Sequence, residues 1–443
     1  MVSLFGTSGI RRSAKELTNQ FCFDIGRTFA KFLANHNQKG KIAVAMDTRQ
    51  SSPRIKKAFS IGIQQEGYKV VDHGIVPVAS MNYLLLANPS FVGSCMITGS
   101  HIRGDHNGFK FFAFKEEILK KHEKEIENIY EEVREKIMFE DREITLEKSN
   151  EAKKKYEEML LNIAHKPYPK YKVVIDLCNG CQSEVIPTVL SKLGLEIIVI
   201  NNSLDPKKFL ARDTETEEAV KQLQQKVIAE KADLGIAYDG DGDRVVFVDN
   251  EGNFIPGDYT GTLIAKYSST PVVVTPINTS QVVETIGKRV IRTKVGSPYV
   301  VETMKKYGST FGFEANGGGI SAEIMLTRDG GSTTIKMLNL LKTTKQNLKE
   351  LVGTLPKFYL YRTKVECPRE LNNIIIQEAK KKYQGKKIED IDGLKVWTDD
   401  STWILFRPSS NASEFRVFAE AKTESEAKKL GTSGIEFVKS FIK

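Results

Sequence analysis

The chain has 443 residues, which is enough for two to four domains. Hydrophobic residues make up 40% of it and charged residues 27%, a balance that excludes a disordered or fibrous chain. The formal net charge is +9, but the acidic residues are spread among the basic ones. Because no basic block with interleaved aromatic residues stands out, we do not expect nucleic-acid binding.

The same sequence argues against a membrane or secreted protein. Its apolar runs are short, and the first residues lack the basic region and apolar core of a signal peptide. Cys178 and Cys181 form a lone C-x-x-C, without the second pair or the histidine cluster that would complete a zinc site. We therefore expect a cytoplasmic protein with reduced cysteines and no membrane segment.

The N-terminal part begins with a candidate anion-binding loop. Residues 5–12 contain two glycines, two hydroxyl side chains and two arginines, although a simple turn is the alternative. Alternating elements follow: a helix at 21–35, a strand at 41–46, a helix at 52–65 and a strand at 68–72. This alternation predicts a parallel, doubly wound sheet.

A strand at 93–98 leads into a loop with many reactive side chains. Ser100 follows a glycine at the strand end, so we expect its hydroxyl to be exposed. Four potential cations would surround it: His101, Arg103, His106 and Lys110. This pattern suits a phosphorylated serine, whereas a polar surface loop is the alternative.

A second alternating unit follows a charged segment, 115–153, that we expect to be helical. The elements expected here are strands at 172–176, 195–200 and 232–238 and helices at 182–193 and 217–230. Directly after the last strand, Asp239, Asp241 and Asp243 alternate with glycines before Arg244. An extended backbone would point all three carboxylates to one side, where Mg²⁺ could neutralise them. A solvated acidic turn is the alternative.

A third unit and a C-terminal segment of different style complete the chain. The third unit should have helices at 258–267, 280–288 and 300–307 and strands at 272–275, 290–293 and 310–314. Glu314 and the glycines after it could bind a polyhydroxyl ligand; a flexible hairpin is the alternative. Strands expected at 360–365, 395–398, 402–406 and 415–421, with helices at 370–383 and from 424 onward, indicate an antiparallel sheet. The loop 407–413 could hold a phosphate, or be an ordinary turn.

Taken in order, these loops resemble those of the α-D-phosphohexomutase superfamily. Its Asp-Gly-Asp-Gly-Asp-Arg motif is matched by 239–244, and its Arg-Pro-Ser loop by 407–409. Its Thr-Ala-Ser-His loop, ending in Asn-Gly-Phe-Lys, is matched at Thr98, Ser100, His101, Asn107, Gly108 and Lys110. The resemblance implies an α/β fold: three related α/β domains with mixed, mostly parallel sheets and a C-terminal α+β domain, around a central cleft. The implied domains are 1–150 for the phosphoserine, 151–251 for the metal, 252–356 for the sugar and 357–443 for the phosphate.

The resemblance also implies an activity and a set of site residues. A hexose 1-phosphate and a hexose 6-phosphate of the mannose or glucose type would interconvert through a phosphoserine and a bound bisphosphosugar. The implied catalytic residues are Ser100, Lys110, Arg11 and His101, and the implied Mg²⁺ ligands are Ser100, Asp239, Asp241 and Asp243. The implied substrate-binding residues are Arg244, Gly296, Glu314, Asn316, Arg407, Ser409, Ser410, Asn411 and Arg416. The partner is a phosphosugar, and a homodimer is compatible with the family.

Three departures from the family pattern bear on the substrate. Ile102 to Gly104 replace the usual Asn-Pro after the histidine, and residues 410–412 replace the usual Gly-Thr-Glu. The sugar loop usually reads Gly-Glu-x-Ser-Gly-His, but Gly318 stands here at the histidine position and should leave room. The side chain of Asn316 offers both a hydrogen-bond donor and an acceptor, so it could bind an amino or acetamido group of the sugar. Phosphoglucosamine and phosphoacetylglucosamine mutases, a magnesium-dependent phosphatase and a non-catalytic sugar-phosphate binding protein therefore stay open as alternatives.

Overall fold

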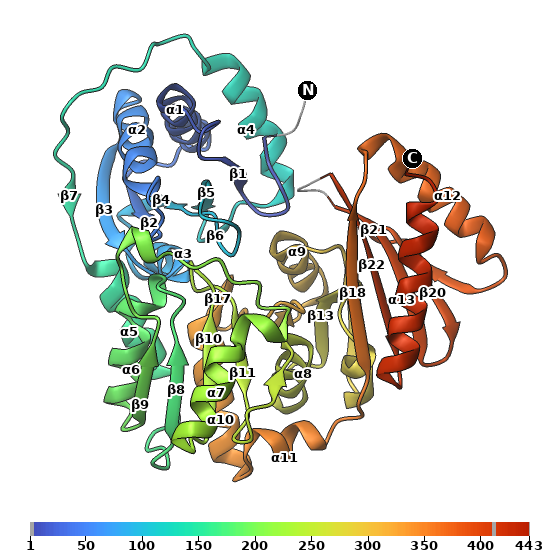
Figure 1. Ribbon diagram of the computed structural model, residues 1–443. Coiled ribbons are helices and arrows are strands. Elements are labelled where there is room, and N and C mark those ends of the chain that lie inside the picture. The colour runs from blue at the N-terminus through green and yellow to red at the C-terminus, as the bar shows by residue number, and fades with distance from the viewer. Residues whose placement is uncertain (1–3, 410–412, 443) are drawn as a thin grey trace.

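Four β-sheets follow one another along the chain in the computed structural model, which describes residues 4–409 and 413–442 (Figure 1). The first three sheets are mixed, whereas every strand pair of the fourth is antiparallel. The expected fold class, three α/β domains and a C-terminal α+β domain, is therefore confirmed. Among the helices in these residues, none combines the length and the apolar character that crossing a bilayer requires.

The first sheet joins parallel strands to one antiparallel hairpin. Its strands are β1 Ile10–Ser13, β2 Lys41–Met46, β3 Lys69–Ile75, β4 Phe91–Ile97, β5 His106–Ala113, β6 Glu116–Glu117 and β7 Glu147–Lys148. Its helices are α1 Asn19–Asn35, α2 Ser52–Gln65, α3 Val78–Ala87 and α4 Lys120–Val133. Strands β4, β2, β3 and β7 run parallel, while β5 returns antiparallel to β4 and also pairs with β1 and β6.

The second sheet repeats this plan. Its strands are β8 Lys172–Asp176, β9 Glu196–Ile200, β10 Leu234–Tyr238, β11 Val245–Val248 and β12 Phe254–Ile255. The helices beside it are α5 Glu151–Asn162, α6 Ile186–Lys192 and α7 Lys221–Glu230. Strands β9, β8 and β10 are parallel, and β11 returns antiparallel to β10.

The third sheet also combines parallel strands with an antiparallel return strand. Its strands are β13 Val272–Pro276, β14 Arg289–Thr293, β15 Phe311–Phe313, β16 Gly319–Ser321 and β17 Met325–Asp329. Its helices are α8 Gly257–Tyr267, α9 Ser297–Tyr307, α10 Gly330–Thr344 and α11 Leu348–Gly353. Strands β14, β13 and β15 are parallel, and β16 returns antiparallel between β15 and β17.

The fourth sheet lies to one side of the other three, at the right of Figure 1. Its strands are β18 Tyr359–Glu366, β19 Lys387–Glu389, β20 Leu394–Asp399, β21 Thr402–Pro408 and β22 Glu414–Ala421. Its helices are α12 Asn372–Lys382 and α13 Glu424–Lys439. Helix α13 packs on β18 and β22, which makes this the α+β part of the molecule.

One hairpin recurs in the first three sheets and carries the candidate loops. In each sheet a parallel strand turns back as an antiparallel neighbour, through loops 98–105, 239–244 and 314–318. In the fourth sheet, β21 and β22 are likewise antiparallel neighbours. The loops that the sequence analysis singled out thus occupy equivalent positions, which explains why three α/β units can build one site.

The second and third sheets share a single hydrophobic core. It contains Val173 and Phe247 from the second sheet and Val273 and Phe313 from the third, all of them buried. Since apolar burial is the main stabilising term in folding, this core holds loops 239–244 and 314–318 in one packed unit. The division at residue 251 therefore separates two sheets that have this core in common, and the four predicted domain bounds stay predictions.

Some expected elements differ from the observed ones. Segment 115–153 contains α4 and the first residues of α5, separated by a stretch without a helix, rather than the continuous helical connection that its charge predicts. The helix expected at 280–288 is a 3₁₀ helix at Gln281–Ile286. Helix α3 was not predicted, because it packs against β4, α5 and β17 and is apolar on several sides, so it lacks a helical period.

Candidate active site

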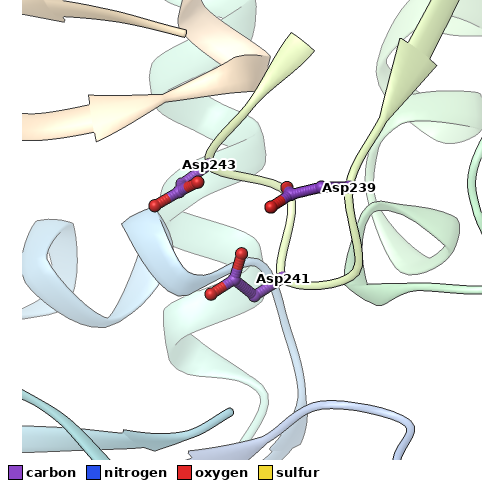
Figure 2. Close-up of side chains that lie close together, drawn as sticks. All are labelled: Asp239, Asp241 and Asp243. Atoms are coloured by element: carbon purple, nitrogen blue, oxygen red, sulfur yellow. The ribbon is translucent and has the colours of Figure 1, made fainter. Parts of the chain in front are cut away.

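Three aspartates meet at the turn between β10 and β11 (Figure 2). One carboxylate oxygen from each of Asp239, Asp241 and Asp243 lies within 4.8 Å of the others, and all three residues are fully buried. Figure 2 shows the three carboxylates close together on a single loop. The predicted cluster is thus present, and the alternative of a solvated acidic turn is wrong.

The carboxylates converge because the backbone turns, not because it is extended. Residues 239–244 form bends rather than a strand, and Gly242 has a φ of +75°. The Oδ1 atom of Asp239 accepts the backbone N–H groups of Gly242 at 3.1 Å and Arg244 at 3.2 Å. The first carboxylate therefore closes the turn itself, so the extended geometry expected from the alternating sequence is wrong.

Other elements hold the backbone of this turn. The N–H of Val78, at the start of α3, donates to the carbonyl of Asp241 at 3.0 Å, and the N–H of Cys181 donates to Gly240 at 3.0 Å. The side-chain amide of Gln182 donates to the carbonyl of Gly242, also at 3.0 Å. The turn is consequently fixed by the first and second sheets together.

The charges of the aspartates are strongly perturbed. Burial, reinforced by Asp243 and Asp239, raises the pKa of Asp241 to about 8. Burial would also raise the pKa of Asp243, but Arg328 and Lys110 outweigh it and hold that pKa below its usual range. The Oδ1 atom of Asp241 has no hydrogen-bond partner within the described residues. The three carboxylates repel one another, and one of their buried oxygens has no partner. A hard divalent cation such as Mg²⁺ would satisfy both conditions.

Ser100 lies against this cluster. Its Oγ donates to Asp239 Oδ2 at 3.0 Å, and the residue is 0% exposed. The prediction of an exposed hydroxyl is wrong, because the turn of the second sheet covers the loop that carries Ser100. The φ of Ser100 is +53°, in the left-handed region that residues other than glycine seldom adopt. The hydroxyl is thus presented to the aspartates by a strained backbone.

A buried ion pair supports this backbone. The guanidinium of Arg49 donates to the carbonyls of Ser100 at 3.1 Å and Ile102 at 2.5 Å, and it pairs with Asp47. Asp47 also accepts the N–H of Gly99 at 3.2 Å. The roles of Asp47 and Arg49 were not predicted, although two opposite charges directly after an apolar strand were a usable signal.

The four expected cations around Ser100 separate into two groups. Arg103 and His106 instead contact Asp105 on the surface, each at 2.9 Å, so their predicted place beside Ser100 is wrong. His101 does approach, with its Nδ1 3.3 Å from Ser100 Oγ. Burial, followed by the nearby arginines, lowers the pKa of His101 well below its usual value, so its imidazole is neutral at pH 7.

Lys110, Arg11 and Arg244 are brought to the aspartates as expected. Lys110 Nζ donates to Asp243 Oδ2 at 2.6 Å; burial opposes its charge, but Asp243 and other carboxylates raise its pKa. Arg11 stands on β1 opposite Gly108, near Asp241; burial lowers its pKa, and that carboxylate acts in the opposite direction. Arg244 Nε lies 3.9 Å from an oxygen of Asp239.

The expected sugar loop is joined to the aspartates by a residue that the sequence analysis missed. Arg328 Nη1 donates to Glu314 Oε2 at 2.5 Å and to Asn316 Oδ1 at 2.9 Å. Its Nη2 lies 3.0 and 2.9 Å from the two carboxylate oxygens of Asp243. Arg328 stands near the end of β17, a strand that was not predicted; the Asp-Gly-Gly sequence that follows it and begins α10 was the available signal.

Gly318 does not leave the room that its lack of a side chain suggests. A Cβ atom there would lie 2.2 Å from the carbonyl oxygen of Asp243 and 2.9 Å from Cγ of Arg328. The φ of Gly318 is +80°, which also disfavours any other residue. The space at this position is therefore filled by the backbone of the aspartate turn and by the stem of Arg328.

Opposite charges balance in this region. Four carboxyl groups gather there, those of Asp239, Asp241, Asp243 and Glu314, with four cationic groups, those of Arg11, Lys110, Arg244 and Arg328, so the charges are equal once a bound cation has displaced the proton that the raised pKa leaves on Asp241. We call these eight residues the charge cluster. A phosphoryl group on Ser100 would add about two negative charges, which one divalent cation would offset.

The fourth sheet presents two arginines side by side. Arg407 on β21 is the cross-strand partner of Arg416 on β22. Arg407 Nε donates to Asp392 Oδ2 at 2.7 Å, and Arg416 lies 3.5 Å from Glu414. Like charges directly opposite one another destabilise a sheet, and these two carboxylates offset part of that repulsion. Ser409 is buried at the end of β21, whereas the predicted Ser410 and Asn411 lie outside the described residues.

Gly296 lies where three candidate loops meet. A Cβ atom on it would stand 2.6 Å from Cγ2 of Thr7, in the N-terminal loop. The N–H of the preceding Val295 donates at 3.0 Å to Asp392, the carboxylate that also binds Arg407. The structure thus brings the predicted loops of the first, third and fourth sheets together.

Comparison with known proteins identifies three consecutive family domains. Residues 2–137, 154–252 and 256–359 match the family descriptions phosphoglucomutase/phosphomannomutase alpha/beta/alpha domains I, II and III. A relative named phosphoglucomutase/phosphomannomutase, from Thermococcus kodakarensis, is 34% identical over 100% of both chains. Another, from Pyrococcus horikoshii, is named probable phosphoglucosamine mutase and is 33% identical over 99% of this chain and 98% of its own.

A solved structure has the same fold. It is a phosphoglucomutase/phosphomannomutase family protein from Burkholderia thailandensis, with a TM-score of 0.84 and 22% identity over 99% of this chain and 98% of that chain. Together with the full-length relatives and the domain matches, this result establishes that the chain belongs to the α-D-phosphohexomutase superfamily, as a member with the three phosphoglucomutase/phosphomannomutase domains.

Proposed function

We propose that the chain is a phosphohexomutase of the mannose or glucose type, which interconverts hexose 1-phosphates and hexose 6-phosphates. A phosphoserine at Ser100 and a bound bisphosphosugar would carry the reaction. The observation that supports this most directly is the 3.0 Å contact between Ser100 Oγ and Asp239, inside a cluster of three carboxylates. A hydroxyl in this position can hold a phosphoryl group beside the cation that neutralises it.

The residues around Ser100 have distinct proposed tasks. Asp239, Asp241 and Asp243, with an oxygen on Ser100, would hold Mg²⁺, which when bound offsets the negative charge of the transferred phosphoryl group. Lys110, Arg11 and Arg244 would donate hydrogen bonds to the phosphoryl oxygens. Neutral His101 is close enough to give a proton to Ser100 Oγ or take one from it.

Two further groups of residues would bind the substrate. Glu314 and Asn316 would contact the sugar hydroxyls, whereas Gly296, Arg407, Ser409 and Arg416 would bind the phosphate that does not react, with Ser410 and Asn411. The crowding of cations on β21 and β22 supports this second role. Separate sites for the two phosphates would allow the bisphosphosugar to bind in either orientation.

An amino-sugar mutase is the second candidate. It is favoured by the relatives named probable phosphoglucosamine mutase, which match this chain almost as closely as the relative named phosphoglucomutase/phosphomannomutase. The cytoplasmic location and the homodimer stay predictions.

An activity panel would test the proposal. Purified protein would be offered the 1-phosphates of mannose, glucose, glucosamine and N-acetylglucosamine with Mg²⁺, and mass spectrometry would locate any phosphate on Ser100. We expect phosphate on Ser100, a 6-phosphate product from mannose or glucose 1-phosphate, and inactivation by EDTA. Release of inorganic phosphate without a 6-phosphate would indicate a phosphatase, and binding without turnover a non-catalytic protein; either result would overturn the proposal.

A further inference from the structure

One buried arginine fixes the orientation of the Asn316 side chain. Arg328 has only hydrogen-bond donors, so the atom of Asn316 that faces it at 2.9 Å must be the carbonyl oxygen Oδ1. The reverse orientation would place two donors against each other. The backbone of Asn316 is held as well, because its carbonyl accepts Thr214 Oγ1 at 2.6 Å. The chemistry of an amide would allow Asn316 to present either its donor or its acceptor to a ligand. The contact with Arg328 leaves only the donor, Nδ2, available.

The loop keeps two polar atoms available for a ligand. Asn316 remains 9% exposed and Glu314 5% exposed. Within the described chain neither Nδ2 of Asn316 nor Oε1 of Glu314 has a hydrogen-bond partner, since Arg328 contacts the other polar atom of each side chain. The loop thus presents one donor and one acceptor, a pair that complements hydroxyl groups, which donate and accept.

The charge of Glu314 is already compensated. Arg328 lies 2.5 Å from Glu314, and Asp243, its other carboxylate partner at 2.9 Å, has Lys110 as a second cation at 2.6 Å. A cationic ligand beside Glu314 would therefore meet the positive charge of Arg328 together with the donor of Asn316. A protonated amine has donors only, so it can accept nothing from that amide.

We propose that Arg328 determines sugar specificity by selecting phosphosugars with neutral substituents, hydroxyl or acetamido, against the cationic amino group of glucosamine phosphates. This inference rests on the proposed function, because it assumes that loop 314–318 contacts the sugar. Arg328 acts as a positioning residue: it orients Asn316 and neutralises Glu314, while its stem fills the space beside Gly318.

The decisive variant is Arg328→Gln, which removes the positive charge and keeps a side-chain donor. Its kcat/KM for glucosamine 1-phosphate, divided by that for glucose 1-phosphate, should rise about tenfold, which corresponds to about 1.4 kcal/mol, because a charge is removed at short range. Arg328→Lys keeps the charge but loses the guanidinium fork that orients Asn316, so its ratio should lie between that of the native chain and that of Arg328→Gln. Any general loss of Mg²⁺ binding or folding affects both substrates and cancels in the ratio.

Binding measured without turnover gives an independent readout. Calorimetry in EDTA on the Ser100→Ala chain should show weaker binding of glucosamine 6-phosphate than of glucose 6-phosphate, and adding Arg328→Gln should reduce the difference. Should Arg328→Gln fail to fold, Asn316→Asp takes its place: it converts the free donor into an acceptor and should shift the same ratios toward the amino sugar.

The possible outcomes separate the two proposals. Turnover of glucose 1-phosphate, with ratios that neither variant changes, would overturn the role of Arg328 and leave the mutase assignment intact. A native chain that prefers the glucosamine phosphates would overturn that role as well. Absence of turnover on every sugar phosphate, combined with binding that still discriminates through Arg328, would overturn the mutase and support the inference.

Discussion

Replacing Ser100 with alanine and with glycine separates the chemistry of its hydroxyl from the strain of its backbone. Both variants lack the proposed phosphoryl acceptor, so both should be inactive. Both also lose the 3.0 Å hydrogen bond to Asp239, which should destabilise the fold by about 1–2 kcal/mol. They differ in one respect: alanine must adopt the left-handed φ of +53°, whereas glycine adopts it without strain.

The expected difference follows from that angle. A left-handed backbone costs a residue with a Cβ atom roughly 1–2 kcal/mol, while glycine gains extra freedom in the unfolded chain worth roughly 0.5–1 kcal/mol. The Ser100→Gly variant should therefore be more stable than Ser100→Ala by about 0.5–1 kcal/mol. At an ordinary right-handed position the order would be reversed.

Urea denaturation in EDTA provides the measurement, because neither variant can be phosphorylated at this position. Mass spectrometry would confirm the absence of phosphate, and a coupled assay would measure residual turnover. Greater stability of the alanine variant would refute the strained conformation of Ser100. Near-native turnover of either variant would refute its role as phosphoryl carrier.

Three further predictions concern the surroundings of the site and the fourth sheet. Arg49→Met should lower kcat about 100-fold with little change in KM, since the Ser100 loop loses its support; equal changes in both constants would contradict this role. Gly318→Ala should destabilise the fold by about 1–3 kcal/mol and weaken Mg²⁺ binding, because its Cβ would stand 2.2 Å from a backbone oxygen. The control is Gly385→Ala, which has a similar φ of +84° and no atom within 4 Å, and it should change Mg²⁺ affinity little. Lys395 is fully buried, and burial is the main cause that lowers its pKa to about 7. Since the unfolded chain holds this proton to higher pH, native stability should rise between pH 7 and pH 10 by up to about 1.4 kcal/mol per unit, and Lys395→Met should flatten that slope in urea titrations.

Much of the fold was predictable because its signals are local. The strands at 41–46 and 172–176 and the helix at 52–65 were predicted with the observed bounds, since each has a continuous apolar or periodic pattern between clear turns. Helix α3 was missed because it is buried on several faces, which erases the helical period. Short strands such as β16 and β17 are recognisable only through their partners in the sheet.

The site was predictable where its residues are neighbours in sequence. The three aspartates share one hexapeptide, so their cluster could be inferred even with the wrong backbone geometry. Arg328 could not be inferred in this way, because 85 residues separate it from Asp243. The burial of Ser100 depends on its contact with Asp239, 139 residues away, and no local sequence pattern predicts that contact.

The equal numbers of positive and negative groups in the charge cluster link phosphorylation to metal affinity. A phosphoryl group on Ser100 upsets this balance by about two charges, so it should tighten the binding of a divalent cation. Thermodynamic reciprocity then requires the cation to favour the phosphorylated chain by the same factor. If Ser100 carries the proposed phosphoryl group, protein prepared in a chelator should consequently retain less phosphate than protein prepared with Mg²⁺, so the metal present during purification would set the phosphorylated fraction of the sample.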